Sequence, residues 1–139
     1  MSTPIHLLLP RQFYDAMLMQ AQAELPNECC GLLAGRIENG VGRVEIRYPL
    51  VNERASPREY FAAPFDAHKD MRDKSIDILA IYHSHPTSEP VPSKKDLADN
   101  FHGNCVVHFI IGLFGGAPIV RGWWLTETDF VEANWQIVE

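Results

Sequence analysis

The sequence lacks the cysteine pattern of a disulfide-stabilised protein or of a cysteine-ligated zinc module. Its three cysteines are the adjacent pair Cys29 and Cys30 and the isolated Cys105, and no two of them are separated by two residues. An odd number of cysteines without spaced pairs gives no disulfide framework. We therefore expect all three to be small buried residues of core strands, in a protein of the reducing cytoplasm.

The sequence also lacks a long hydrophobic run. The N-terminal stretch from His6 to Leu9 is too short for a signal peptide and ends at Pro10. No apolar segment approaches the roughly 20 residues that are needed to span a bilayer. The prediction is a cytoplasmic protein without a membrane segment.

An excess of positive charge is absent as well. The chain has 12 lysines and arginines against 18 acidic residues, which gives a net charge of −6, and no block of like charge stands out. Binding to nucleic acid or to anionic lipid therefore has no electrostatic support. The length of 139 residues and the hydrophobic content of 46% are typical of one compact domain over residues 1–139.

Hydrophobic periodicity and turn residues predict a mixed sheet covered by helices. The predicted helices cover residues 9–26, 64–74 and 94–101. The predicted strands cover residues 29–37, 44–48, 78–82, 105–113, 119–125 and 131–137, with a short extended piece at 59–62. Residues 86–93 contain three prolines and are expected to be irregular.

Two histidines directly follow the strand predicted at 78–82. Side chains two residues apart on a strand point to the same face, so His83 and His85 would present two ring nitrogens to one metal ion. The proline-rich segment then turns the chain back to a short helix, with Ser93 as its N-cap and Asp96 in its first turn. A catalytic zinc site has three protein ligands and one open position. His83, His85 and Asp96 form such a set.

Each of these residues has an ordinary explanation when it is taken alone. An isolated His-x-His pair is common, Asp96 suits the positive end of a helix, and Ser93 suits an N-cap. Glu28, which precedes the apolar run from Cys29 to Leu33, is by itself most simply a solvated loop residue. Their combination after a buried strand favours metal-assisted hydrolysis, in which a glutamate serves as the proton shuttle.

The sequence assigns no role to several histidines and to the tryptophans. The unassigned histidines are His6, His68, His102 and His108. The tryptophans suit either the core or the surface of a homodimer, and the sequence leaves both alternatives open for Trp123, Trp124 and Trp135.

Glu28, together with His83-x-His85-Pro86, six further residues and Ser93-x-x-Asp96, resembles the JAMM motif of the JAB/MPN metalloprotease family. The resemblance implies an α/β (α+β) fold, in which a curved mixed β-sheet is flanked by helices, related to the cytidine deaminase architecture. It also implies a zinc ion (Zn2+) bound by His83, His85 and Asp96. Glu28 would deprotonate the attacking water, and Ser93 would donate a hydrogen bond to the oxyanion.

The resemblance implies a substrate as well. Family members hydrolyse the bond after the C-terminal Gly-Gly of ubiquitin or of a ubiquitin-like protein, and the compact bacterial members trim sulfur-carrier proteins in this way. A glycine pair lets an extended tail enter a groove that is too narrow for side chains. A strand edge can hold such a tail by main-chain hydrogen bonds, and residues 54–61 are the candidate edge.

Three alternatives compete with this function. A general isopeptidase acting on lysine conjugates differs only in the leaving group, which no residue reports. A non-catalytic MPN-type scaffold usually lacks a ligand or the glutamate, and this chain has all of them. A zinc nucleobase deaminase needs a Pro-Cys-x-x-Cys motif, which this sequence does not contain.

Overall fold

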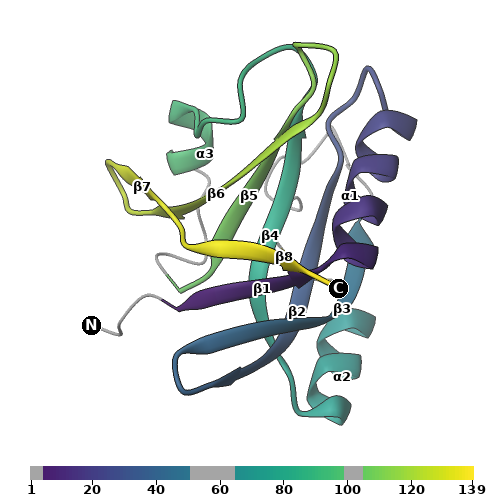
Figure 1. The fold of residues 1–139 in the computed structure, drawn as a ribbon, viewed down its shortest axis with the longest axis vertical. Coiled ribbons are helices and arrows are strands. Elements are labelled where there is room, and N and C mark those ends of the chain that lie inside the picture. The colour runs from purple at the N-terminus through teal and green to yellow at the C-terminus, as the bar shows by residue number, and fades with distance from the viewer. Residues whose placement is uncertain (1–4, 51–64, 99–104) are drawn as a thin grey trace.

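The computed structural model describes residues 5–50, 65–98 and 105–139. In this part of the chain, eight strands form one mixed sheet in the order β7-β6-β5-β4-β2-β3-β1-β8 (Figure 1). The strands are β1 (His6–Pro10), β2 (Cys30–Glu38), β3 (Val41–Leu50), β4 (Asp77–His85), β5 (Val107–Gly112), β6 (Ile119–Leu125), β7 (Phe130–Glu132) and β8 (Trp135–Val138). The helices are α1 (Arg11–Ala23), α2 (Phe65–Lys74) and α3 (Lys94–Ala98).

Strand β4 lies in the middle of the sheet, with β2 antiparallel on one side and β5 parallel on the other. The register pairs His83 with Cys30 of β2 and with Ile110 of β5. The end of β4 is therefore fixed on both sides by neighbouring strands, and its residues have little freedom to move.

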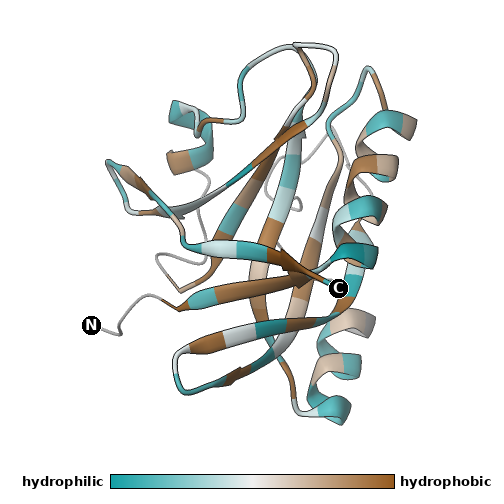
Figure 2. Ribbon diagram, viewed as in Figure 1, coloured by the Kyte–Doolittle hydropathy of each residue, from teal (hydrophilic) through white to brown (hydrophobic). Residues whose placement is uncertain are grey.

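The two longer helices cover opposite faces of this sheet. Consecutive residues on a strand point to opposite faces, and Ile81 and Tyr82 pack into different hydrophobic clusters. Tyr82 shares its cluster with Met17 of α1, whereas Ile81 shares its cluster with Met71 of α2. Figure 2 shows hydrophilic stretches along both helices and hydrophobic stretches in the strands. His83, two residues after Ile81, belongs to the α2 face.

The short helix α3 lies on the same face as α2. Its Leu97 packs against a third cluster, which contains Ile110, Trp123 and Leu125. Ile110 is the neighbour of His83 in the sheet, and laterally paired residues point to the same face. Helix α3 is thereby brought to the face on which the histidines lie.

The sheet curls until its two ends meet. Figure 1 shows β8 and β1 crossing in front of β4 and β5, and the Trp135 ring packs edge-on against Phe109 of β5 at 4.9 Å between centroids. The Ala133 amide donates to the Gly122 carbonyl at 2.8 Å, which ties the segment before β8 to β6. The expected curved mixed sheet flanked by helices is confirmed.

The N-terminal boundary of the first helix was predicted wrongly. Residues 6–10 form strand β1, and the helix spans Arg11–Ala23 rather than 9–26. Leu7 and Leu9 are fully buried between β3 and β8, and Leu25 is exposed. Because β1 obtains its partners from residues far along the chain, local sequence does not reveal it.

The last predicted strand is two strands. Strand β7 pairs with β6, whereas β8 pairs with β1 at the other edge of the sheet. Cys29 and Cys30 are buried as expected, but Cys105 is exposed because β5 begins only at Val107. The predictions at 52–57, 59–62 and 99–101 lie outside the described residues. No helix in the described ranges is long and apolar enough to cross a membrane.

Candidate metal centre

The two histidines of the motif converge at the end of β4. Extended geometry places both side chains on one face, and the strands on either side bury them: His83 is 1% exposed and His85 is 9% exposed. Their Nε2 atoms are 3.2 Å apart, and the ring centroids are separated by 5.0 Å. The pair presents two donor nitrogens to one point.

Asp96 meets this pair from α3. One carboxylate oxygen lies 3.2 Å from Nε2 of His83, and the other lies 3.2 Å from Nε2 of His85. The carboxylate is held by the helix start, because the Ser93 amide donates to it at 2.9 Å. The Ser93 hydroxyl in turn accepts the Asp96 amide at 3.1 Å. The predicted capping box is confirmed, and it orients the carboxylate toward the histidines.

Glu28 lies beside the two histidines, just before β2. Its carboxylate and the two imidazoles offer ligand atoms that all lie within 4.8 Å of one another. The position of Glu28 depends on its neighbour Cys29, which forms two hydrogen bonds with Ser84, the residue between the two histidines. The Cys29 amide donates to the Ser84 hydroxyl at 2.8 Å, and the Ser84 amide donates to the Cys29 carbonyl at 3.1 Å.

A backbone carbonyl orients the second histidine. Nδ1 of His85 lies 2.9 Å from the Glu89 carbonyl oxygen, which can only accept a hydrogen bond. Nδ1 therefore carries the hydrogen, and Nε2 of the neutral ring keeps its lone pair for a ligand. Nothing in the sequence marks this contact, because every residue has a backbone carbonyl.

The electrostatics of the cluster favour a cation between these groups. Burial opposes ionisation of Asp96, but hydrogen bonds from His83 and His85 outweigh it and hold the pKa of that carboxyl well below its usual range. Burial lowers the pKa of His85, whereas Asp96 and the Glu89 carbonyl raise it, and the net change is upward. A buried carboxylate thus lies beside two imidazole nitrogens, and all three groups would stabilise a positive charge placed between them.

The two cysteines that follow Glu28 have thiol groups of low reactivity. Burial raises the pKa of Cys29 to about 11 and that of Cys30 to about 12. Burial therefore disfavours the thiolate form of both residues near neutral pH and gives neither the lowered pKa of a nucleophilic cysteine.

The donor set fits a zinc ion. Zinc binds histidine nitrogen and carboxylate oxygen at about 2.0–2.2 Å, so the ligand atoms of a tetrahedral site lie about 3.3 Å apart. His83, His85 and Asp96 show donor separations of 3.2 Å for each of their three pairings, with a different Asp96 oxygen facing each histidine. Two nitrogens and one oxygen also suit zinc chemically.

Other sequence candidates lie elsewhere. His108 is buried within β5 and His68 is exposed on α2, whereas His102 lies outside the described residues. Trp123 is buried in the third cluster, and Trp124 and Trp135 pack against the cluster of α1, so all three contribute to the core.

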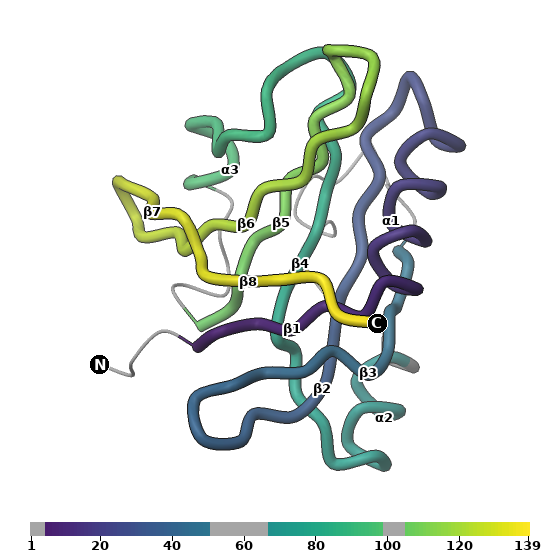
Figure 3. Tube along the Cα trace, viewed as in Figure 1, coloured from purple at the N-terminus to yellow at the C-terminus, as the bar shows by residue number. Residues whose placement is uncertain are grey.

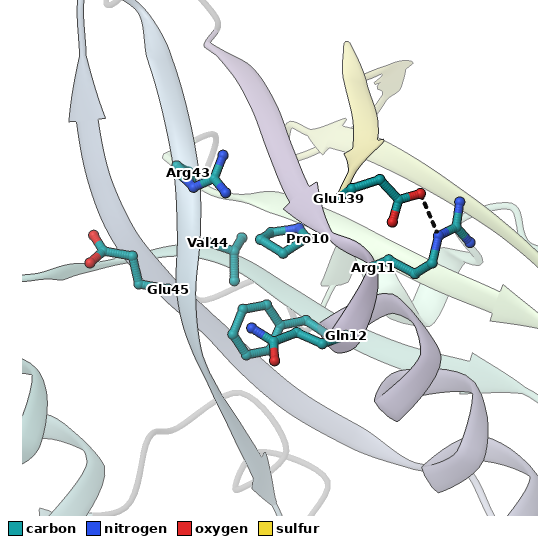
Figure 4. A pocket seen from close by; sticks show the side chains of 8 residues that line it. Pro10, Arg11, Gln12, Arg43, Val44, Glu45 and Glu139 are labelled. Carbon is teal, nitrogen blue, oxygen red and sulfur yellow. Dashed lines mark hydrogen bonds and ion pairs between the residues drawn. The ribbon is translucent and has the colours of Figure 1, made fainter.

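A separate cleft lies where β1 leads into α1, opposite β3 (Figure 4). Arg11 donates to the Glu139 carboxylate at 3.1 Å at its rim, and Arg43 and Glu45 add charges of both signs. Its lining includes neither motif histidine, so the metal centre remains the candidate site.

The family model described as "Prokaryotic homologs of the JAB domain" matches residues 10–126. This chain belongs to that family. The match extends from the start of α1 to the end of β6, and it therefore contains every residue of the cluster.

Three curated relatives illustrate what this JAB-family chain is similar to. Tail tip assembly protein K of Escherichia phage N15 is 37% identical over 84 residues, which are 60% of this chain and 32% of that protein. The CysO-cysteine peptidase of Mycobacterium tuberculosis is 32% identical over 94 residues, 66% of this chain and 63% of that protein. A probable TtuB-protein conjugate cleaving protease of Thermus thermophilus is 36% identical over 97 residues, 67% and 62% of the two chains. The chain thus spans less than two thirds of the length of these relatives.

Solved structures extend the likeness to the fold. A Desulfitobacterium hafniense protein, determined in solution, has a TM-score of 0.82 and 31% identity over 96% of this chain and 93% of that chain. A JAB1/MPN domain protein from Archaeoglobus fulgidus has a TM-score of 0.57 and 16% identity over 99% of this chain and 100% of that chain. The JAB/MPN fold expected from the motif is confirmed.

Proposed function

We propose that this chain is a zinc-dependent peptidase that hydrolyses the bond after the C-terminal Gly-Gly of a ubiquitin-like sulfur-carrier protein. One observation carries the proposal. At the end of β4, the donor atoms of His83, His85 and Asp96 lie 3.2 Å from one another, with the Glu28 carboxylate beside the histidines. Such a set leaves a metal ion with room for a reacting group.

The proposed roles follow from the positions of the side chains. Zinc held by His83, His85 and Asp96 would polarise the scissile carbonyl and lower the pKa of water to about 7. Glu28 would take a proton from the attacking water and pass it to the leaving amine, because its carboxylate lies next to the ligand set. The Ser93 oxygen accepts the Asp96 amide, so its own hydrogen is available for the developing oxyanion.

The names of two relatives support a carrier protein as the substrate. One is a CysO-cysteine peptidase, and the other is a probable TtuB-protein conjugate cleaving protease. The first name favours trimming of a small adduct from a carrier, which is the primary proposal. The expected docking edge at 54–61 lies outside the described residues and stays a prediction.

A lysine isopeptidase is the second candidate function. The relative from Thermus thermophilus, which is 36% identical, is named for cleaving protein conjugates, and the same catalytic groups would serve both leaving amines. The non-catalytic scaffold finds no comparable support, because His83, His85, Asp96 and Glu28 lie together.

We also propose that residues 1–139 form a single domain, because the described strands form one continuous sheet. The cysteines of the described residues are free thiols, which supports a cytoplasmic location. A homodimer stays a prediction.

Mass spectrometry of a carrier with a short extension after Gly-Gly tests the proposed activity. Wild-type protein should release the extension, and a chelator should abolish cleavage until zinc is restored. Glu28→Gln should retain the fold and bound zinc but lose about 100-fold to 10,000-fold in rate, because only the proton shuttle is removed. A lysine-linked carrier conjugate in parallel separates the two candidate functions. Chelator-resistant cleavage, or loss of zinc from Glu28→Gln, would contradict the assigned roles.

A further inference from the structure

Residues 86–93, here called the strap, join the end of β4 to α3 and so separate His85 from Asp96 in sequence. Figure 3 shows the strap running beside the hairpin between β5 and β6. No helix or strand is assigned within the strap. The distance between His85 and Asp96 therefore depends on the packing of Leu97 of α3 and on contacts that hold the strap from outside.

The strap is held from outside by Trp123 of β6. Its indole Nε1 donates to the Pro90 carbonyl at 2.9 Å, and both residues are buried. The ring itself is fixed on its own strand and on β7: the Arg121 guanidinium lies 4.4 Å from its centroid, and Phe130 packs edge-on at 5.2 Å. The donor is thus a rigid group on a strand of the sheet.

Two consecutive carbonyls of the strap are used by different partners. The Glu89 carbonyl faces Nδ1 of His85, and the Pro90 carbonyl faces Trp123. Two such bonds on adjacent peptide groups define the rotation of the strap as well as its distance from the sheet. Gly112 of β5 also lies against Pro90, where an added Cβ would be 2.6 Å from the proline ring.

A buried indole N–H usually finds some acceptor, and that alone would be a packing role. Here the acceptor lies between the carbonyl that orients His85 and the capping box that orients Asp96. We propose that Trp123 is a positioning residue for the metal centre, which holds the strap through Pro90 so that Asp96 meets His83 and His85. This inference rests on the proposed metal site.

The test compares Trp123→Phe, which keeps an aromatic ring but removes the donor, with the matched control Trp135→Phe. Trp135 packs against Phe109 in the cluster of α1, away from the strap. Hydrogen exchange of the strap amides is measured in metal-free protein, and zinc affinity is measured by competition with a chromophoric chelator. Thermal unfolding of both variants corrects for general loss of stability.

Trp123→Phe should accelerate exchange in the strap and weaken zinc binding by about 10-fold to 100-fold, the range typical of groups that orient metal ligands. Trp135→Phe should change neither quantity beyond its effect on stability. Gly112→Ala, whose added Cβ would press on the Pro90 ring, should also weaken zinc binding and serves if Trp123→Phe does not fold. Unchanged zinc affinity in both Trp123→Phe and Gly112→Ala would overturn the inference. Failure of the wild-type protein to bind zinc would instead overturn the proposed function, and strap exchange would still report whether Trp123 holds the strap.

Discussion

Ser84 shows how a single residue organises both halves of the site. It lies between the histidines in sequence, its side chain is fully buried, and it bonds to both backbone polar groups of Cys29. Because Glu28 directly precedes Cys29, these two bonds link the proposed general base to the strand that carries the two histidines proposed as ligands. The motif places the serine there, but only the structure shows what it contacts.

We expect Ser84→Ala to act on Glu28 more than on the metal. The substitution leaves the buried Cys29 amide without its hydroxyl acceptor, which costs about 1–3 kcal/mol in the free energy of unfolding. The rate of cleavage should fall while zinc content stays near one ion per chain, as measured by urea unfolding, kinetics and metal analysis. Ser84→Thr keeps the hydroxyl and should behave more like wild type. Equal loss of zinc and activity in Ser84→Ala would show that the serine supports the ligands instead.

Asp96→Ala tests the third ligand. Removing the carboxylate that faces both histidines at 3.2 Å should lower zinc affinity by more than the 10-fold to 100-fold typical of groups outside the ligand set. Asp77→Ala is the matched control, because Asp77 is an exposed aspartate at the start of β4, the strand that ends with the two histidines. Zinc affinity unchanged in Asp96→Ala would remove Asp96 from the ligands.

The convergence of His83, His85 and Asp96 was predictable because their spacing is local. The strand geometry brings His83 and His85 together, and the capping box places Asp96 at the start of α3. The contacts of Trp123 and of the Glu89 carbonyl were not predictable, since one comes from a distant strand and the other from the backbone.

At the scale of elements, a β-bulge explains why the side chains of β3 do not all follow the alternation that its sequence predicts. The alternation of Val44, Ile46 and Tyr48 predicts one buried face and a hairpin. The hairpin is confirmed, but β2 and β3 shift register at Ala34 and Gly35, so that Glu45 is an extra residue. Val44 therefore packs with the cluster of α1, and Ile46 and Tyr48 pack with the cluster of α2.

The contact between β2 and β4 depends on a missing side chain. An added Cβ at Gly31 would lie 2.2 Å from the ring of Tyr82, whose hydroxyl donates to Gln20 of α1 at 2.5 Å and accepts from Arg47 at 3.0 Å. Gly31→Ala should therefore destabilise the fold by about 1–3 kcal/mol, as overpacking does. Urea unfolding measures this change.

Gly115→Ala is the control for Gly31→Ala, because an added Cβ there meets open space in the hairpin between β5 and β6. It should leave the free energy of unfolding within about 0.5 kcal/mol of wild type. Equal stability of the two variants would mean that Tyr82 moves aside at little cost.

At the scale of the whole molecule, we expect the fold to form without a metal ion. The described residues form three hydrophobic clusters, on both faces of a curled sheet, and the proposed ligands lie at its margin, two at the end of β4 and one on α3. The pairing of β8 with β1 joins distant segments, so local patterns did not predict it, whereas β7 pairs with its neighbour β6 in a local hairpin.

Removal of zinc should therefore lower the melting temperature without unfolding the protein. A ligand at 100 times its dissociation constant stabilises the folded state by about 2.7 kcal/mol, which corresponds to a shift on the order of 10 °C for a chain of this size. Circular dichroism with and without chelator measures both quantities. A metal-free chain that has lost its β-sheet signal at 25 °C would contradict this view.

The most direct measurement of the central claim is the anomalous diffraction of zinc in crystals of the zinc-loaded protein. We expect one strong peak about 2.0–2.2 Å from Nε2 of His83, Nε2 of His85 and one carboxylate oxygen of Asp96, with Glu28 outside bonding distance. A peak bound by Glu28 in place of Asp96, or no peak between the histidines, would contradict it.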